Sequence, residues 1–102
     1  MAKVKITVLK KLTGKDMFGD NLPAGLPSPP ECSVLKTGQE FVLERGSCPP
    51  DFCSWAFADI HRDIIHLLMG GDYSFAEKKG TAYPCCTDGL RPVIFKLERI
   101  ED

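Results

Sequence analysis

The chain has no excess of charge of either sign. Its 102 residues include 13 Lys plus Arg and 14 Asp plus Glu, which give a formal net charge of −1. The basic residues form no run, so the sequence lacks the electrostatic footprint of a protein that binds nucleic acid or an anionic membrane surface. We therefore expect neither nucleic acid nor a membrane among its partners.

Long apolar runs are also missing. The longest apolar segment with helical spacing runs from Phe52 to Met69, and Asp59, Arg62 and Asp63 interrupt it, so we expect no membrane span. The residues after Met1 pass straight into alternating sequence, without the apolar stretch of a signal peptide. We therefore expect a cytoplasmic protein.

The length and composition predict a small folded unit. A chain of 102 residues with 43% hydrophobic content predicts a single domain over residues 1–102. Its core is thin, because a domain of this size buries only about two thirds of the surface that the unfolded chain exposes. A metal, a disulfide or a partner subunit would therefore add to its stability.

Alternating apolar residues predict three strands. Apolar and polar residues alternate over Lys3–Leu9, with the period of a half-buried antiparallel strand. Similar patterns predict strands over Gln39–Arg45 and Val93–Ile100, and a weaker one indicates a short strand around Tyr73–Phe75. Exposed edges of such a sheet favour pairing with a second copy, so we expect a homo-oligomer.

Apolar residues with helical spacing follow the strand over Gln39–Arg45. We expect Asp51 to cap a helix that begins near it and ends at Gly70-Gly71. Together these elements predict an α+β fold, in which a small antiparallel β-sheet packs against one main α-helix. Residues 13–36 carry four prolines and show no periodicity, which predicts a long proline-rich loop. A loop of this length is normally functional, or is held by a ligand or partner.

The five cysteines are the unusual feature of the composition. In a reducing compartment, cysteines serve as metal ligands or reactive thiols more often than as structural disulfides. Cys32, Cys53, Cys85 and Cys86 come from the long loop, the helix start and the turn before the last strand. If they meet, they form a metal site for zinc or an iron–sulfur cluster, which would also hold the long loop. Cys48 and Cys53 have C-x4-C spacing, but no C-x2-C follows to complete a zinc or ferredoxin motif.

Cys53 is the candidate catalytic residue. It falls in the first turn of the predicted helix, where unpaired N–H groups and the positive end of the helix dipole stabilise an anion. A reactive thiolate is one interpretation of this position. The other is a small hydrophobic residue packed beside Trp55 and Phe57, and both stay open at this point.

Cys85 and Cys86 are adjacent in the sequence and precede the last strand. Neighbouring side chains in extended backbone point to opposite sides, so we expect only one of them to join a given site. A vicinal disulfide between them would be strained and easily opened, which suits a redox switch. Arg91 follows in the same loop and has three candidate roles: it stabilises a thiolate, binds an anionic cofactor or ligand, or anchors the loop.

The polar residues of the predicted helix give a weaker signal. Asp59, Asp63 and His66 share one face, and with Arg62 we expect a solvated surface with local ion pairs. The two histidines of the helix lack the i, i+4 spacing of a helical metal pair. Trp55 has no nucleic-acid-binding pattern around it and is expected to be a packing residue.

The segment CCTDGLRPVIFKLE, residues 85–98, is long and specific. Together with the first strand and the helix start, it resembles a family of small prokaryotic proteins of uncharacterised function. The resemblance covers most of the chain and implies that Cys32, Cys53, Cys85 and Cys86 belong together, with Cys48 as an addition. It implies no particular reaction. The residues just before Cys32 depart from the Gly-x-Cys-Pro context of the family.

Three functions remain open from the sequence. The first is a cysteine-rich protein that binds a metal or iron–sulfur cluster and acts in electron transfer with a redox partner, or as an accessory protein. The second is a thiol enzyme or redox sensor, with Cys53 as nucleophile and Cys85 or Cys86 as resolving thiol. The third is an interaction domain whose cysteines only pack, so that replacing them changes stability alone.

Overall fold

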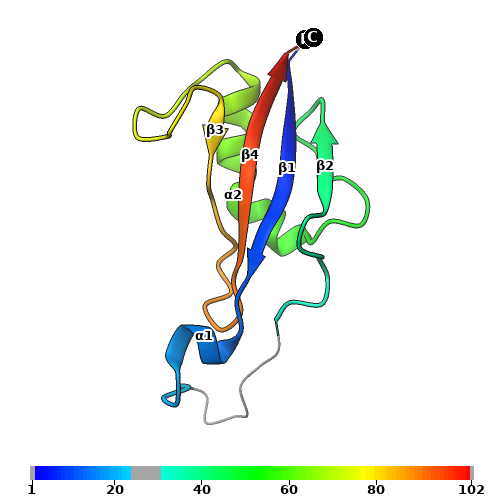
Figure 1. The fold of residues 1–102 in the computed structure, drawn as a ribbon. Helices are drawn as coiled ribbons and strands as arrows, with labels where there is room; N and C mark the ends of the chain where they lie inside the picture. Colours follow the sequence, from blue (N-terminus) through cyan, green and yellow to red (C-terminus); the bar gives the residue numbers. More distant parts are fainter. Residues whose placement is uncertain (1, 24–30, 102) are drawn as a thin grey trace.

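The structure is a computed structural model that describes residues 2–23 and 31–101. Its long helix lies on one face of an antiparallel sheet (Figure 1), which confirms the predicted α+β fold. No helix in the described part of the chain is long and apolar enough to cross a membrane. The elements in chain order are β1 (Ala2–Lys11), α1 (Gly14–Phe18), β2 (Glu40–Leu43), α2 (Ser54–Leu68), β3 (Thr81–Ala82) and β4 (Val93–Glu101).

The centre of the sheet is formed by β1 and β4. The strand order is β2-β1-β4-β3, and all neighbouring strands are antiparallel. Val4 lies opposite Leu43 of β2, and Ile6 lies opposite Leu97 of β4. All four side chains are buried, because alternate residues of a strand face the helix-covered side of the sheet. The alternation over Lys3–Leu9 therefore predicted this strand and its buried face correctly.

A β-bulge interrupts β1 near its carboxyl end. The pairing of β1 with β4 shifts between Val8 and Lys10, which leaves Leu9 as an extra residue. An inserted residue reverses the inward and outward alternation of side chains. Lys11 therefore lies opposite the buried Val93, and the Lys11 side chain is only 10% exposed.

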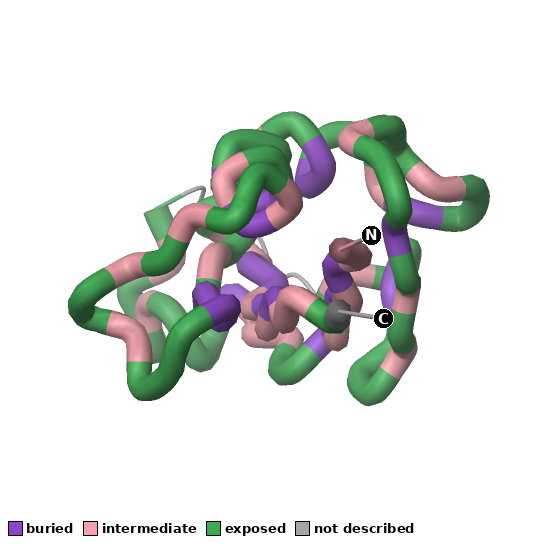
Figure 2. Tube along the Cα trace, turned by 90° about the horizontal axis from the view of Figure 1, so that it is seen from above, coloured by how far each residue is buried: buried purple, intermediate pink, exposed green. Residues whose placement is uncertain are grey.

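Helix α2 covers the inner face of the sheet. Figure 2 shows that buried positions of the helix turn toward the strands. These side chains join the inward residues of β1 and β4 in one hydrophobic core. Full burial of one large apolar side chain contributes roughly 1.5–3 kcal/mol, so the contact between helix and sheet provides much of the stability. The buried apolar residues of α2 are Ala56, Phe57, Ile60, Ile64 and Leu67.

The prediction that Asp51 caps the helix was wrong. Asp51 has a φ of 66° and lies before the helix, while Cys53 occupies the N-cap position of α2. Asp is one of the few residues that adopt this left-handed conformation at low cost, so Asp51 allows the chain to turn just before the helix. The end of the helix agrees with the sequence, because α2 stops just before Gly70, whose φ is 88°.

An arginine of β4 binds the carboxyl end of α2. The Arg99 guanidinium donates hydrogen bonds to the carbonyl oxygens of Leu67 (3.2 Å) and Gly71 (2.7 Å) and to Oδ1 of Asp72 (2.8 Å). The bond from Arg99 lowers the pKa of Asp72, against a smaller opposing effect of burial, and the N–H of Gly80 lowers it further. This contact ties the helix end and the following turn to the sheet.

The region predicted as a structureless loop, residues 13–36, contains the short helix α1. The N–H of Asp16 donates to Oγ1 of Thr13 (3.0 Å), and the N–H of Thr13 donates to Oδ2 of Asp16 (2.8 Å). This reciprocal capping box satisfies two helix-end donors and stabilises a single turn. Pro27, Pro29 and Pro30, on which the loop prediction partly rests, lie outside the described residues.

The strand suggested around Tyr73–Phe75 was also wrong. Residues 74–75 form a turn, and the strand of this region is β3, Thr81–Ala82. The Tyr73 hydroxyl donates a hydrogen bond to the buried carboxylate of Asp63 on α2. Tyr73 therefore packs against the helix instead of pairing in the sheet.

Two strand predictions differ from the structure only at their ends. The strand expected over Gln39–Arg45 is limited to Glu40–Leu43, because the chain bends after Leu43 on its way to α2. The strand expected over Val93–Ile100 extends to Glu101, which pairs with Ala2.

Candidate functional site

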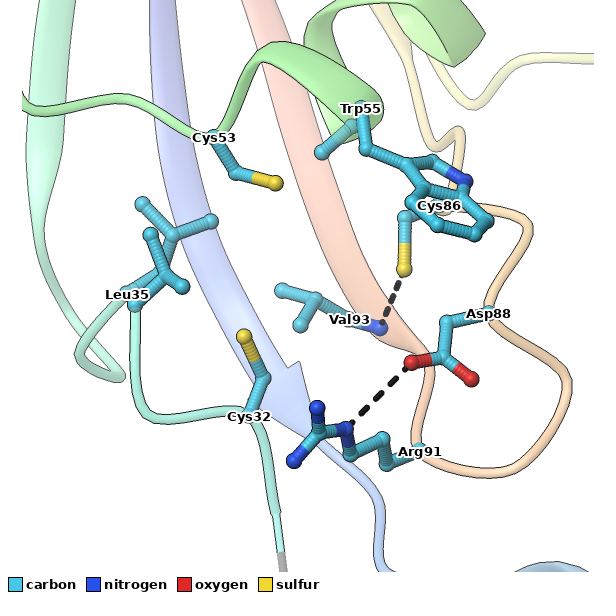
Figure 3. Close-up of a pocket in the computed structure, with 10 residues that line it drawn as sticks. Cys32, Leu35, Cys53, Trp55, Cys86, Asp88, Arg91 and Val93 are labelled. Carbon is cyan, nitrogen blue, oxygen red and sulfur yellow. Dashed lines mark hydrogen bonds and ion pairs between the residues drawn. The ribbon is translucent and has the colours of Figure 1, made fainter.

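A pocket of about 160 Å³ lies where three segments of the chain meet (Figure 3). The first segment is the end of the long loop, the second is the start of α2, and the third is the loop between β3 and β4. Each segment contributes one cysteine, and most of the other lining residues are apolar. The lining residues are Cys32, Val34, Leu35, Cys53, Trp55, Ala56, Cys86, Asp88, Arg91 and Val93.

Cys53 contributes its thiol from the N-cap position of α2. This side chain makes no capping hydrogen bond to the helix, and Figure 3 shows it pointing into the pocket. Ser, Thr, Asp or Asn at this position would cap the first turn, so the helix lacks a stabilising contact that these residues provide. Cys53 is half-buried, which leaves its sulfur accessible from the pocket.

Cys85 and Cys86 have different environments despite being adjacent. Cys86 is buried, and its N–H donates to the carbonyl oxygen of Val93 (3.0 Å). The N–H of Val93 in turn donates to Sγ of Cys86 (3.2 Å), which fixes the direction of the thiol. Cys85 forms a β-bridge with Ile94, is exposed and does not line the pocket. The side chains of this pair therefore diverge, and only Cys86 faces the pocket.

Cys32 is held at the pocket through its backbone. Nζ of Lys11 donates to the carbonyl oxygens of Cys32 (3.0 Å) and Leu35 (2.7 Å), and forms an ion pair with Glu31 (3.5 Å). Lys11 reaches these groups because the β-bulge turns it to the inner side of β1. Leu35 is almost completely buried, so residues 31–35 are fixed against the end of the strand.

The loop that carries Cys86 is fastened to α2 by Thr87. Nε1 of Trp55 donates to Oγ1 of Thr87 (2.9 Å), while the hydroxyl and N–H of Thr87 donate to the Asp59 carboxylate (3.0 and 2.8 Å). Trp55 and Asp59 are one helical turn apart, so both side chains reach the same residue. These three residues, the Thr87 latch, set the position of Cys86 relative to Cys53.

Arg91 brings a positive charge to the pocket. Its Nε donates to Oδ2 of Asp88 (3.3 Å), and Oδ1 of Asp88 accepts a hydrogen bond from the N–H of Leu90 (3.1 Å). The turn over residues 88–91 therefore orients the arginine side chain. In Figure 3 the guanidinium extends toward the side of the pocket that carries Cys32.

Three of the four cysteines expected to meet line this pocket. All five cysteines of the chain are free thiols, so Cys85 and Cys86 are not joined by a vicinal disulfide. No three His, Cys, Asp or Glu side chains within residues 2–23 and 31–101 are grouped so that they could hold a metal ion. The pocket thus brings the thiols to one place without arranging them as a preformed metal centre.

Cys48 belongs to a different part of the surface. It is exposed and lines a shallow depression with residues 42–45. Desolvation raises the pKa of the Cys48 thiol, and the nearby Cys53 raises it further. The Cys48 thiol is therefore protonated at neutral pH.

The polar face of α2 differs from the expected solvated surface. Asp63 is buried and bonded to Tyr73, and Asp59 belongs to the Thr87 latch. The expected local ion pair between Arg62 and Asp63 is present at 3.8 Å. The face is therefore a docking surface for two loops.

Sequence reasoning missed three residues that shape the pocket. Trp55 was expected to be a packing residue, but it is 64% exposed and borders the pocket. Its i, i+4 spacing from Asp59 was a usable signal for a shared partner. Lys11 and Thr87 gave no signal, because their roles depend on a bulge and on a contact between distant segments.

Comparison with protein-family models, with curated proteins and with solved structures finds no match to this chain. The resemblance to a family of small prokaryotic proteins therefore rests on the sequence of this chain alone, above all on the motif of residues 85–98, and stays a prediction.

Proposed function

We propose that the protein is a thiol-based redox protein in which Cys53 is the nucleophile and Cys86 is the resolving thiol. The observation that carries this proposal is that both thiols line one pocket, whereas the neighbour of Cys86, Cys85, lies outside it. Reactive cysteines are partly exposed and lie near helix N-termini or cationic side chains. Cys53 meets these conditions, because it is half-buried at the start of α2 and shares its pocket with Arg91.

The chemistry is a thiol–disulfide exchange with a disulfide substrate. The Cys53 thiolate attacks one sulfur of the substrate, the substrate S–S bond breaks, and one thiolate leaves. The Cys86 thiolate then attacks Sγ of Cys53 in the mixed disulfide and releases the second substrate thiol. Two electrons pass from the two cysteines to the substrate, and the two protons lost from Cys53 and Cys86 end on the released thiols.

The Thr87 latch supports this pairing. Resolution requires the second thiol to be held near the first, and the latch connects the loop of Cys86 directly to the first two turns of α2. The hydrogen bond from the N–H of Val93 to Sγ of Cys86 fixes the direction of that thiol. Cys85 lacks both constraints, so we assign the resolving role to Cys86.

Equilibration with mixtures of reduced and oxidised glutathione tests the proposal. After acid quenching and alkylation, peptide mass spectrometry should identify a disulfide between Cys53 and Cys86. C86S should accumulate a glutathione mixed disulfide at Cys53, and C53S should form neither product. C85S is the matched control and should behave as the wild type. A disulfide that uses Cys85, or a C86S protein that behaves as the wild type, would refute the assignment.

A second candidate function uses the third thiol of the pocket. Disulfide exchange needs two cysteines, whereas three thiolates from separate segments are a ligand set for zinc or, with a further ligand, an iron–sulfur cluster. The thiols would have to converge on the ion, and ligand convergence commonly accompanies metal binding. Elemental analysis of protein purified without oxygen or chelator tests this candidate. Stoichiometric metal that C32S loses and C85S retains would favour it, since Cys32 has no part in the exchange reaction.

A further inference from the structure

Arg91 has hydrogen-bonding capacity that the fold leaves unused. Asp88 engages its Nε, but the two Nη groups make no hydrogen bond within the described chain. The arginine side chain is 42% exposed and borders the same pocket as the three thiols. A guanidinium presents its N–H groups as a planar fork that matches the two oxygens of a carboxylate.

The other groups around the pocket favour a negative charge at this place. Among the described residues that line the pocket, Asp88 alone is acidic, and Arg91 and the N–H of Leu90 bind its carboxylate. Lys11 is not available, because carbonyl oxygens and Glu31 already surround its Nζ. The first turn of α2 contributes the positive end of the helix dipole. The side chain of its N-cap residue, Cys53, makes no capping hydrogen bond to the free N–H groups there.

Apolar side chains flank the opening of the pocket. Val34 is 56% exposed and Trp55 is 64% exposed, and both line the same cavity as Arg91. They offer a surface for the carbon skeleton of a small molecule between the arginine and the sulfur atoms. The pocket volume of about 160 Å³ corresponds to roughly five water molecules, so only a small organic group fits.

We propose that the pocket selects small organic carboxylates that carry a thiol-reactive atom, with the carboxylate on Arg91 and the reactive atom at Cys53. This inference rests on the proposed function for the role of Cys53 and adds the class of substrate. Arg91 is then the specificity-determining residue of the pocket. A carboxylate-bearing disulfide is the substrate class that combines this selection with thiol–disulfide exchange.

Iodoacetate and iodoacetamide provide a matched pair of probes. In both, the thiolate attacks the CH2 carbon and iodide leaves, so that iodoacetate transfers a carboxymethyl group and iodoacetamide the neutral carbamoylmethyl group. The rate of each reaction is measured separately at Cys53 and Cys85 by peptide mass spectrometry, so that the exposed Cys85 corrects for intrinsic reactivity. The ratio of iodoacetate rate to iodoacetamide rate should be about threefold to tenfold higher at Cys53 than at Cys85. In R91Q the ratio at Cys53 should fall most of the way to the ratio at Cys85, and only the contribution of the α2 dipole should remain.

R62Q is the control for a change of charge elsewhere, because Arg62 is 89% exposed and does not line the pocket. It should keep the wild-type ratios. Equal ratios at Cys53 and Cys85 in the wild type, or an unchanged preference in folded R91Q, would overturn the proposal. Raising the salt concentration should weaken the preference, as expected for a partly exposed charge.

A second measurement uses disulfides as substrates. Dithiodiglycolate carries two carboxylates, whereas 2-hydroxyethyl disulfide is neutral, and each can oxidise Cys53 and Cys86 with release of two thiols. R91Q should lose most of the preference for dithiodiglycolate while still forming the internal disulfide with the neutral reagent. If iodoacetate selectivity is present but no internal disulfide forms, the carboxylate site stands and the redox function fails. If the internal disulfide forms at a rate that does not depend on Arg91, the redox function stands and the carboxylate site fails.

Discussion

Replacing Thr87 by Val tests whether the latch controls access to Cys86. Valine keeps the shape of threonine and the backbone N–H bond to Asp59, but removes the hydroxyl bonds to Trp55 and Asp59. These bonds are exposed, so each contributes little, and together they should stabilise the closed loop by about 1 kcal/mol. A change of about 1 kcal/mol raises the population of the open loop roughly fivefold.

The assay is the rate at which N-ethylmaleimide labels each cysteine. Cys86 is buried and reacts only when the loop opens, so its labelling rate should rise roughly fivefold in T87V. Cys85 is exposed and should be labelled at an unchanged rate. T37V is the matched control, because Thr37 is exposed and its hydroxyl has no partner within the described residues. An unchanged rate at Cys86 in T87V would refute the role of the latch.

Two further predictions concern the clamp that Arg99 forms with Leu67, Gly71 and Asp72 at the end of α2. R99M keeps the alkyl chain but loses the bonds to the carbonyl groups of Leu67 and Gly71, so urea titration should give a free energy of unfolding about 2–3 kcal/mol lower; a change near zero would contradict the clamp. Because the folded-state pKa of Asp72 is lowered, its stabilising contribution is present above its unfolded pKa, about pH 4, and is lost as pH falls through the folded pKa. D72N should therefore have a lower free energy of unfolding than the wild type at neutral pH, and this free energy should fall less as the pH drops below about 4. Urea titration at each pH measures both. If the free energy of unfolding of D72N falls with acid as much as that of the wild type, Asp72 does not contribute.

The main elements of the fold could be predicted because they follow simple periods. Alternation over Lys3–Leu9 identified β1, and apolar residues with helical spacing identified α2. Short elements gave much weaker signals. The two-residue strand β3 has too few positions to show a period, and α1 depends on one capping box between Thr13 and Asp16. Tertiary contacts determine whether such segments form.

The candidate site was predictable in its residue types but not in its geometry. The five cysteines stood out from composition, and the divergence of Cys85 and Cys86 follows from alternation in extended backbone. The sequence placed Cys32 at the site, but how it is held there could not be predicted, because this depends on Lys11 and on the bulge that turns Lys11 inward. A one-residue insertion reverses the direction of every later side chain in the strand, and the local pattern does not mark it.

Each pocket cysteine is positioned by a different feature of the fold. Lys11 holds the backbone of Cys32, the N-cap of α2 presents Cys53, and the Thr87 latch holds Cys86. Local unfolding of one segment therefore removes one thiol and leaves the others in place. In the proposed reaction, a bond between Cys53 and Cys86 would connect the same two segments that the latch already connects. Oxidation would then add little new order to the chain, but it would prevent the loop between β3 and β4 from opening. The redox state would therefore control how freely this loop, which carries Cys86 and Arg91, opens.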